Sequence, residues 1–406
     1  MYKNLEFIIV MCRYRQTIKL QNMSILKTHF DVAIIGAGII GASIAYELSR
    51  YNLEVVVLEK NPKVANETSL GNSGLIHGGF DPEPHKLEAK LNLQGNLKWR
   101  EWFKHLEFPR VEIDSLILAF NEEEMKHVHM LYERGLTNGL NKKDLKVLTT
   151  QEVLKKEPNV NPAVKGGLLC TSSVAIHPVE ATRALLGAAK QNDTRLRVNS
   201  EVTNIKYEGD RFALTINNKD KIYARKVINA AGHYADKLAN KFGFDNFKQT
   251  TRRGEYRILD NYDKNLINSV LFKVPTIHGK GIIIAPTLDG HYLVGPTAQD
   301  GVPKEDISLV TKEKYDLIGK IGKDIVPSLK IERTIKTIAG SRPIDVETND
   351  FVIRKSKKNP NFILAAGMQS PALSSAPAIA SEIANLLNLK LTPRENFKPD
   401  YKIDIF

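Results

Sequence analysis

A glycine-rich turn near residue 36 has the composition and spacing of a site for a phosphate-bearing ligand. Residues 36–41 read GAGIIG; they follow an apolar run at 31–35 and precede a helical pattern at 42–51. In such a turn Gly36 permits the tight bend, Gly38 lets the backbone approach a pyrophosphate, and Gly41 lets the helix pack close to the strand. The helix N terminus then presents free N–H groups and the positive end of its dipole to the anion.

Glu59 adds a second chemical group to this turn. It ends the apolar run at 53–58 and lies 18 positions after Gly41. A carboxylate there can hydrogen-bond the ribose hydroxyls of an adenosine, and it argues against NADP as the principal ligand. Strand, glycines, helix, strand and acid in this order predict a dinucleotide site; the alternative is a glycine-rich turn with packing duties only.

The segment that follows Glu59 favours a flavin over a nicotinamide. Residues 66–79 read NETSLGNSGLIHGG, which is too polar for a core helix and too rich in glycine for a regular strand. Such a loop can lie against a flat cofactor, where side chains would clash and backbone N–H groups can donate. A plain surface loop is the alternative interpretation.

Apolar periodicity predicts the elements that must position these residues. Strands are expected at 31–35, 53–58, 111–120 and 362–366, and several more at 196–228 with turns at 208–210 and 217–218. Helices are expected at 42–51, 85–106, 122–134, 178–191 and 377–387. Asp289-Gly290 predicts a hairpin between strands 282–286 and 292–296. The pattern predicts an α/β fold in which both ends of the chain share one sheet and a mixed second domain is inserted.

Composition narrows the class of protein. The chain has 406 residues, a formal net charge of +12 and two cysteines, Cys12 and Cys170. The charge fits a solvated basic surface, attraction of anionic ligands or, more remotely, nucleic-acid binding. Two cysteines predict no disulfide framework and no metal site, and they favour a cytoplasmic location.

The first residues carry no clear structural signal. No stretch approaches the ~18 continuous apolar residues that a membrane span requires. An apolar run at 7–12 lies between basic residues but lacks a small-residue cleavage site, so we do not expect a signal peptide. Residues 1–28 are predicted to be an extension, and Met23 is a candidate start.

Three motifs in this order resemble the D-amino-acid-oxidase-like flavoproteins. They are the front half formed by residues 36–41, Glu59 and 66–79, the second flavin motif at 229–232 (NAAG), and the C-terminal loop at 366–371 (AGMQSP). The closest resemblance is to the branch that holds L-2-hydroxyglutarate dehydrogenases and type 2 (mycoplasma-type) glycerol-3-phosphate oxidases. Residues 71–80, 251–259, 275–281 and 340–345 resemble the latter.

The resemblance implies a Rossmann-type FAD-binding domain with an inserted mixed α+β substrate domain. The FAD domain is expected at 29–110, 174–250 and 340–406, and the substrate domain at 111–173 and 251–339. FAD is expected to be noncovalent. The implied cofactor-binding residues are Gly36, Ala37, Gly38, Ile39, Ile40, Gly41, Glu59, Thr68, Ser69, Asn72, Ser73, Gly74, Leu75, Val202, Ala231, Gly232, Gly340, Arg342, Gly367, Met368, Gln369 and Ser370.

Oxidation of a secondary alcohol requires a base and an anchor for the substrate. His77 is the predicted base because an imidazole titrates near neutral pH; His278 and His233 are the runners-up. The resemblance places Arg342 over the flavin, where a guanidinium can hold a phosphate with two parallel hydrogen bonds. The alternative for His77 is a structural, hydrogen-bonded histidine, and the alternative for Arg342 is an interdomain salt bridge.

Three further residues have candidate roles at the substrate. Lys280 is expected to pair with the phosphate or to favour oxygen reduction near the flavin, unless it is an ordinary solvated lysine. Ser73 and Ser370 are expected to orient hydroxyls or to cap backbone. Arg253 and Glu255 are assigned no catalytic step.

The resemblance thus implies oxidation of sn-glycerol 3-phosphate to dihydroxyacetone phosphate, with molecular oxygen reduced to hydrogen peroxide. The alternative is a dehydrogenase of glycerol 3-phosphate or L-2-hydroxyglutarate that uses a quinone or another acceptor. An FAD-dependent tRNA-modifying protein is the remote alternative, and no nucleic-acid partner is expected. Peripheral membrane contact and the choice between monomer and homodimer stay open.

Overall fold

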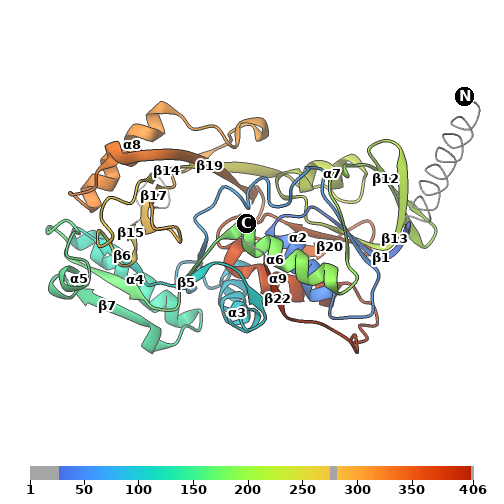
Figure 1. Cartoon of the computed structure of the whole chain (residues 1–406), viewed down its shortest axis with the longest axis horizontal. Helices are drawn as coiled ribbons and strands as arrows, with labels where there is room; N and C mark the ends of the chain where they lie inside the picture. Colours follow the sequence, from blue (N-terminus) through green and yellow to red (C-terminus); the bar gives the residue numbers. More distant parts are fainter. Residues whose placement is uncertain (1–26, 275–280, 404–406) are drawn as a thin grey trace, which may run out of the picture.

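The computed structural model describes residues 27–274 and 281–403. Most of the predicted extension, together with His278 and Lys280, lies outside the described residues. The described chain forms two large sheets joined by long strands (Figure 1). None of the helices within the described ranges is long and apolar enough to cross a membrane.

The first sheet has a parallel centre with antiparallel additions. Its parallel strands lie in the order β10, β2, β1, β13 and β21. The bounds are β1 His29–Ile35, β2 Val55–Leu58, β10 Arg195–Arg197, β11 Val202–Glu208, β12 Arg211–Ile216, β13 Asp220–Asn229, β20 Val352–Lys355 and β21 Phe362–Ala366. All four residues of β2 are buried, as expected for a parallel strand that is covered on both faces.

Alternate residues of these strands enter two different cores. Val55 and Val57 pack against the helices on one face, whereas Val56 and Leu58 pack with Phe212 on the other. The first face is covered by α2 Ile39–Leu48, α3 Leu87–Trp102, α6 Pro178–Gln191 and α9 Ala372–Leu386. The second face packs with residues of β11, β12 and α7 Ala235–Lys241 (Figure 1). This layering is the Rossmann-type arrangement that the N-terminal pattern predicts.

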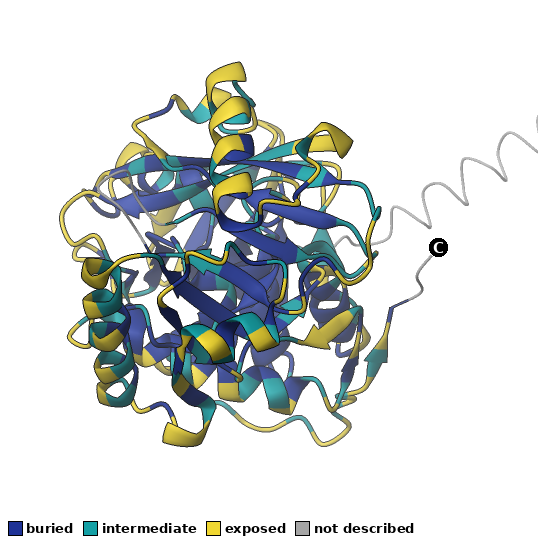
Figure 2. Ribbon diagram, turned by 90° about the vertical axis from the view of Figure 1, so that its left-hand side faces the viewer, coloured by how far each residue is buried: buried dark blue, intermediate teal, exposed yellow. Residues whose placement is uncertain are grey.

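The second sheet is mixed and lies beside the first. Its strands are β6 Ser115–Ala119, β7 Leu145–Thr149, β8 Gly166–Cys170, β14 Gln249–Leu259, β15 Val270–Lys273, β16 Ile283–Pro286, β17 Tyr292–Gly295, β18 Gln299–Asp300 and β19 Thr334–Asp345. Helices α4 Glu122–Thr137, α5 Thr150–Lys156 and α8 Lys312–Ile325 flank it. Figure 2 shows buried strands in this part of the molecule beneath helices with exposed outer faces. The long pair β14 and β19 extends from here toward the first sheet.

Two small sheets complete the fold. Strand β3 Leu75–Ile76 pairs with β9 Val174–Ile176, which also pairs with β5 Arg110–Glu112. Strand β4 Leu106–Glu107 pairs with β22 Tyr401–Lys402. The first of these sheets positions the chain immediately before His77.

Several sequence predictions are confirmed in detail. The helix at 178–191 and the strand at 362–366 have the expected bounds, and the turn at Asp289-Gly290 joins β16 to β17. The strand expected at 111–120 is wrong as one element, because it divides into β5 and β6, which join different sheets. The domain boundaries stay a prediction; strand β19 runs across the boundary expected at residue 340.

The last helix begins earlier than predicted, at Ala372, and contains Pro377 in its interior. Proline has no N–H to donate to the carbonyl four residues earlier, which is that of Leu373. Trp99 on α3 supplies the missing donor, because its Nε1 lies 2.9 Å from the Leu373 oxygen. A tertiary contact therefore allows the helix to continue through a residue that normally begins or ends one.

Candidate active site

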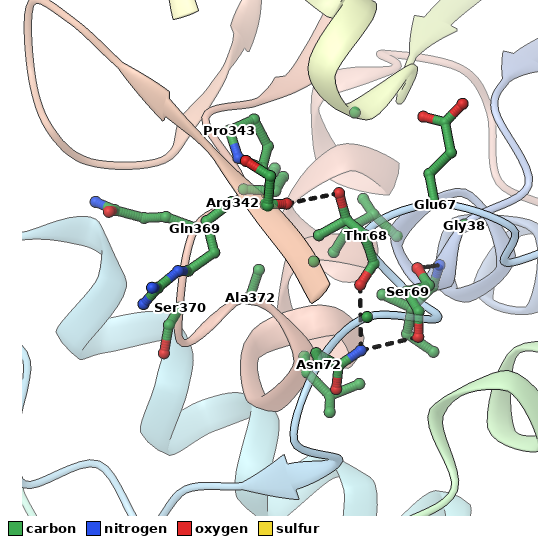
Figure 3. Close-up of a pocket in the computed structure, with 18 of the residues that line it drawn as sticks. Gly38, Glu67, Thr68, Ser69, Asn72, Arg342, Pro343, Gln369, Ser370 and Ala372 are labelled. Atoms are coloured by element: carbon green, nitrogen blue, oxygen red, sulfur yellow. Dashed lines mark hydrogen bonds between the residues drawn. The ribbon is translucent and has the colours of Figure 1, made fainter. Parts of the chain in front are cut away.

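One cavity of about 480 Å³ joins the glycine turn to the long strands of the second sheet. Its lining includes Gly38 and Glu59 at one end, the loop around Ser69, and His77, Tyr256 and Arg342 at the other. Figure 3 shows part of this lining, with residues of the glycine-rich loop 66–79 opposite residues of β19 and of the C-terminal loop 366–371. The volume lies in the usual range for small-molecule sites, roughly 300–1,000 Å³.

The glycines of the turn have distinct geometric duties. Gly36 has φ +104°, and a Cβ there would lie 2.4 Å from the oxygen of Ala230. A Cβ on Gly41 would lie 2.0 Å from the oxygen of Gly36, so the helix packs against the turn itself. Gly38 lines the cavity, where its lack of a side chain leaves the backbone open to a ligand. The turn therefore fits a pyrophosphate, as the spacing predicts.

The Glu59 carboxylate is fixed by backbone donors. Ala37 N donates to Oε2 at 2.9 Å and Asn61 N donates to Oε1 at 2.8 Å. A carboxylate has about four acceptor positions, so it retains capacity for two hydroxyls. Glu59 lines the cavity, and this arrangement fits the ribose of an adenosine.

Ser69 modifies the expected anion site at the start of α2. Its Oγ accepts a hydrogen bond from Ile39 N at 3.0 Å, so this N–H is not free as the sequence prediction assumed. The serine hydroxyl still has its own proton to donate into the cavity. An anion at this helix would therefore meet a hydroxyl donor in addition to the helix dipole.

The glycine-rich loop packs directly on β19. A Cβ on Gly340 would lie 1.8 Å from the oxygen of Gly71, and Thr68 Oγ1 donates to the oxygen of Ser341 at 2.9 Å. The Asn72 side chain bonds within its own loop, since its Nδ2 donates to the oxygen of Ser69 at 2.8 Å (Figure 3). Small residues are needed here because two backbones meet.

His77 follows β3 and is held through its backbone. Its N–H donates to Ser374 Oγ on α9 at 2.8 Å, and its carbonyl accepts from Asn96 Nδ2 on α3 at 3.0 Å. The half-buried imidazole lines the cavity, with its ring centroid 6.2 Å from that of Phe272. The backbone position of His77 therefore depends on two helices, and its imidazole brings the chemistry of a general base to the cavity.

Arg342 brings a positive charge to the same cavity. Its Nη2 is buried and has no hydrogen-bond partner among the described residues. Burial lowers the pKa of the guanidinium, and the nearby Tyr256 and Asp300 offset only part of that shift. Asp300 is itself paired with Arg252, whose Nη2 lies 2.9 Å from Oδ2. Because a buried charge without a partner is costly, this arrangement favours an anionic ligand.

The remaining predicted residues divide by whether they reach the cavity. Its lining includes Ile39, Ile40, Leu75, Val202, Ala231, Gly232, Gly340, Met368, Gln369, and the two serines Ser73 and Ser370. Figure 3 shows Ser370 and the Arg342 guanidinium extending toward the same part of the cavity. Ala37, Gly41, Gly74 and Gly367 are absent from the lining. The direct contacts of all these residues with a cofactor stay predictions.

His233 does not face the cavity. It is fully buried, and its ring Nε2 lies 2.9 Å from the oxygen of Ser341. Burial lowers the pKa of this imidazole, which favours the neutral form with Nε2 as the donor. The residue fastens β19 to the second flavin motif, so a packing role describes it better than the base.

Sequence reasoning missed Gln249, which joins the two later flavin motifs. Its Nε2 donates to the oxygen of Gly232 at 3.0 Å, and its Oε1 accepts from the N–H of Gly367 at 2.7 Å. Gln249 N in turn donates to Asp236 Oδ2 at 2.9 Å. No local pattern marks this residue, because its two partners lie 17 and 118 positions away.

Gln249→Leu is expected to weaken FAD binding by about tenfold or more, because the half-buried oxygen of Gly232 and the buried N–H of Gly367 lose their partner, at about 1–3 kcal/mol each. Titration of the apoprotein with FAD, followed by flavin fluorescence, measures this effect. Gln191→Leu is the matched control, since its Nε2 also makes two bonds, to the oxygens of Lys398 and Asp400. Equal FAD affinity in both variants would contradict the role of Gln249.

Comparisons with known proteins agree with this geometry. The chain is 48% identical over 377 residues to a glycerol 3-phosphate oxidase of Mycoplasma pneumoniae, covering 92% of this chain and 98% of that protein. It is 39% identical over 373 residues to a glycerol 3-phosphate dehydrogenase of Caloramator mitchellensis, covering 91% and 77%. The solved structure of dithionite-reduced L-alpha-glycerophosphate oxidase from Mycoplasma pneumoniae with FAD bound matches with a TM-score of 0.91 and 47% identity, covering 94% of this chain and all of that one.

These matches confirm the predicted fold class and cofactor. Residues 31–386, which include both large sheets and the cavity, match the family model described as FAD dependent oxidoreductase. The glycine turn, Glu59 and the glycine-rich loop that packs on β19 have a geometry that fits FAD. The chain belongs to the family of FAD dependent oxidoreductases.

Proposed function

We propose that this chain oxidises sn-glycerol 3-phosphate to dihydroxyacetone phosphate, with oxygen as the electron acceptor and hydrogen peroxide as the second product. The observation that carries the proposal is the buried Nη2 of Arg342, which has no hydrogen-bond partner among the described residues and lies in the cavity that His77 also lines. The similarity to glycerol 3-phosphate oxidases and a glycerol 3-phosphate dehydrogenase supports the substrate.

In this proposal Arg342 binds the phosphate and His77 takes the proton of the C2 hydroxyl. When bound, FAD accepts the hydride that leaves C2. The backbone of His77 is held by Ser374 and Asn96, so the base would stand on a fixed stretch of chain beside the alcohol. Phe272 beside His77 covers one side of the reacting centre and reduces access of water. Ser73 and Ser370 are proposed to orient the hydroxyls.

Lys280 remains a candidate from the sequence, as a second cation for the phosphate or a charge that favours oxygen reduction. It lies outside the described residues. The proposed substrate does not depend on it, because Arg342 already supplies a buried cation within the described part of the cavity.

The test is anaerobic mixing of the FAD-loaded enzyme with glycerol 3-phosphate, followed by admission of air. We expect rapid bleaching of the flavin, then rapid recolouring with one equivalent of peroxide per turnover. Slow recolouring in air but fast recolouring with a quinone would show that the electron acceptor is not oxygen. Bleaching by L-2-hydroxyglutarate and not by glycerol 3-phosphate would overturn the substrate.

A further inference from the structure

The strand pair β14–β19 presents two faces with different chemistry. In its antiparallel register Arg252 lies opposite Arg342, Gly254 opposite Gly340, and Tyr256 opposite Ile338. Side chains alternate along a strand, so Gly254 and Tyr256 share a face, as do Gly340 and Arg342. All four of these residues line the cavity. The face is therefore hollow at the glycine pair and carries Arg342 and Tyr256 on either side of it.

The residues between them face the other way and satisfy one another. Arg253 and Glu255 form a buried ion pair with a nitrogen–oxygen distance of 3.0 Å. Glu255 also accepts the backbone N–H of Thr311 at 2.6 Å. The opposite face of β14 is thus closed by internal pairing, which leaves Tyr256 and Arg342 as the polar side chains that this part of the pair directs into the cavity.

Tyr256 is a largely buried residue that lines the cavity, and no hydrogen bond joins its Oη to another described residue. Only 6% of the residue is exposed. Burial raises the pKa of the phenol, and the charge of Arg342 acts in the opposite direction. The two side chains lie on the shared face of the strand pair, on either side of the glycine pair, and both line the cavity. Buried tyrosines usually find a partner. Tyr262, which follows the end of β14, illustrates this, since its Oη accepts from the N–H of Lys330 at 2.9 Å.

We propose that Tyr256 donates a hydrogen bond from its Oη to the anionic group that Arg342 binds, and so contributes to selectivity for a phosphorylated alcohol. This inference rests on the proposed function, because it assigns the phosphate to the Arg342 end of the cavity. A phenol that stays protonated at neutral pH is a donor without charge of its own. It would add to the affinity for a phosphate oxygen. Because it is neutral, it would not add a second buried charge that destabilises the protein when no ligand is bound.

Tyr256→Phe in the FAD-loaded enzyme tests the proposal. A hydrogen bond to a charged group corresponds to roughly a ten- to hundredfold change in affinity. We expect KM for glycerol 3-phosphate, and the Kd for inorganic phosphate measured from the spectrum of bound FAD, to rise by that factor. We expect kcat to change less than about threefold, and kcat/KM for glycerol, which has no phosphate, to stay the same. Tyr262→Phe is the matched control and is expected to change none of these values.

Each outcome bears on Tyr256 separately from the substrate. Unchanged phosphate affinity in Tyr256→Phe, or an equal loss for glycerol and glycerol 3-phosphate, would overturn the inference. If the wild-type flavin is not reduced by glycerol 3-phosphate, the proposed function fails, while the phosphate titration still decides the role of Tyr256. If Tyr256→Phe does not retain FAD, Tyr256→Gln restores a donor. Phosphate affinity near that of the wild type then supports the inference, and a hundredfold loss contradicts it.

Discussion

His77→Ala is expected to give a yellow, FAD-loaded protein whose kcat is lower by about 10²–10⁴-fold, the range of a lost general base. The backbone of residue 77 is held by Ser374 and Asn96, and neither bond involves the imidazole. The loop should therefore keep its position when the ring is removed. Stopped-flow bleaching of the flavin by glycerol 3-phosphate measures the loss directly at the chemical step.

The control for this variant is His85→Ala, because His85 lies in the same region but is largely exposed. It is expected to bleach at the wild-type rate. If His77→Ala also bleached at that rate with normal FAD content, His77 would have no part in proton transfer. Loss of FAD from His77→Ala would instead assign the residue to the cofactor.

Arg342→Ala is expected to raise KM for glycerol 3-phosphate by about 10²-fold or more, since loss of a buried charge partner corresponds to roughly 3–5 kcal/mol. The guanidinium has a buried Nη2 without a partner in the described part of the chain, so its removal takes away the group proposed to bind the substrate phosphate. Steady-state kinetics measure the effect. Arg342→Lys keeps the charge but loses the paired donors, so its KM should lie between that of the wild type and that of Arg342→Ala.

The thermal stability of a variant can distinguish phosphate binding by Arg342 from a structural role. Burial already lowers the pKa of Arg342, so the charged side chain costs free energy when no anion is bound. We therefore expect Arg342→Met, without substrate, to have a Tm equal to or above that of the wild type. The control Arg333→Ala removes an exposed arginine that pairs with Asp260 and should leave KM unchanged. A clear fall in Tm for Arg342→Met, with KM unaffected, would make Arg342 a structural residue.

The sequence alone determined the dinucleotide half of the molecule. Gly36, Gly41 and Glu59 act within about two dozen residues of one another, so their order along the chain reports their geometry. Gly36 needs its positive φ, and a Cβ at Gly41 would meet the turn. Patterns of this kind are readable because the physical constraint is local. The family followed from the order of three such patterns, and the cofactor prediction followed from the family.

Tertiary structure alone decided how the distant segments meet. Pairings between segments with no common sequence signal decide three features. They are the partners of Gln249, the shared cavity face of Tyr256 and Arg342, and the hydrogen bond of His233 to β19. Pro377 likewise sits inside a helix because Trp99, 278 positions earlier, supplies a donor. A local pattern records what a residue does to its own backbone. It does not record which buried polar group, far along the chain, lacks a partner until the chain is folded.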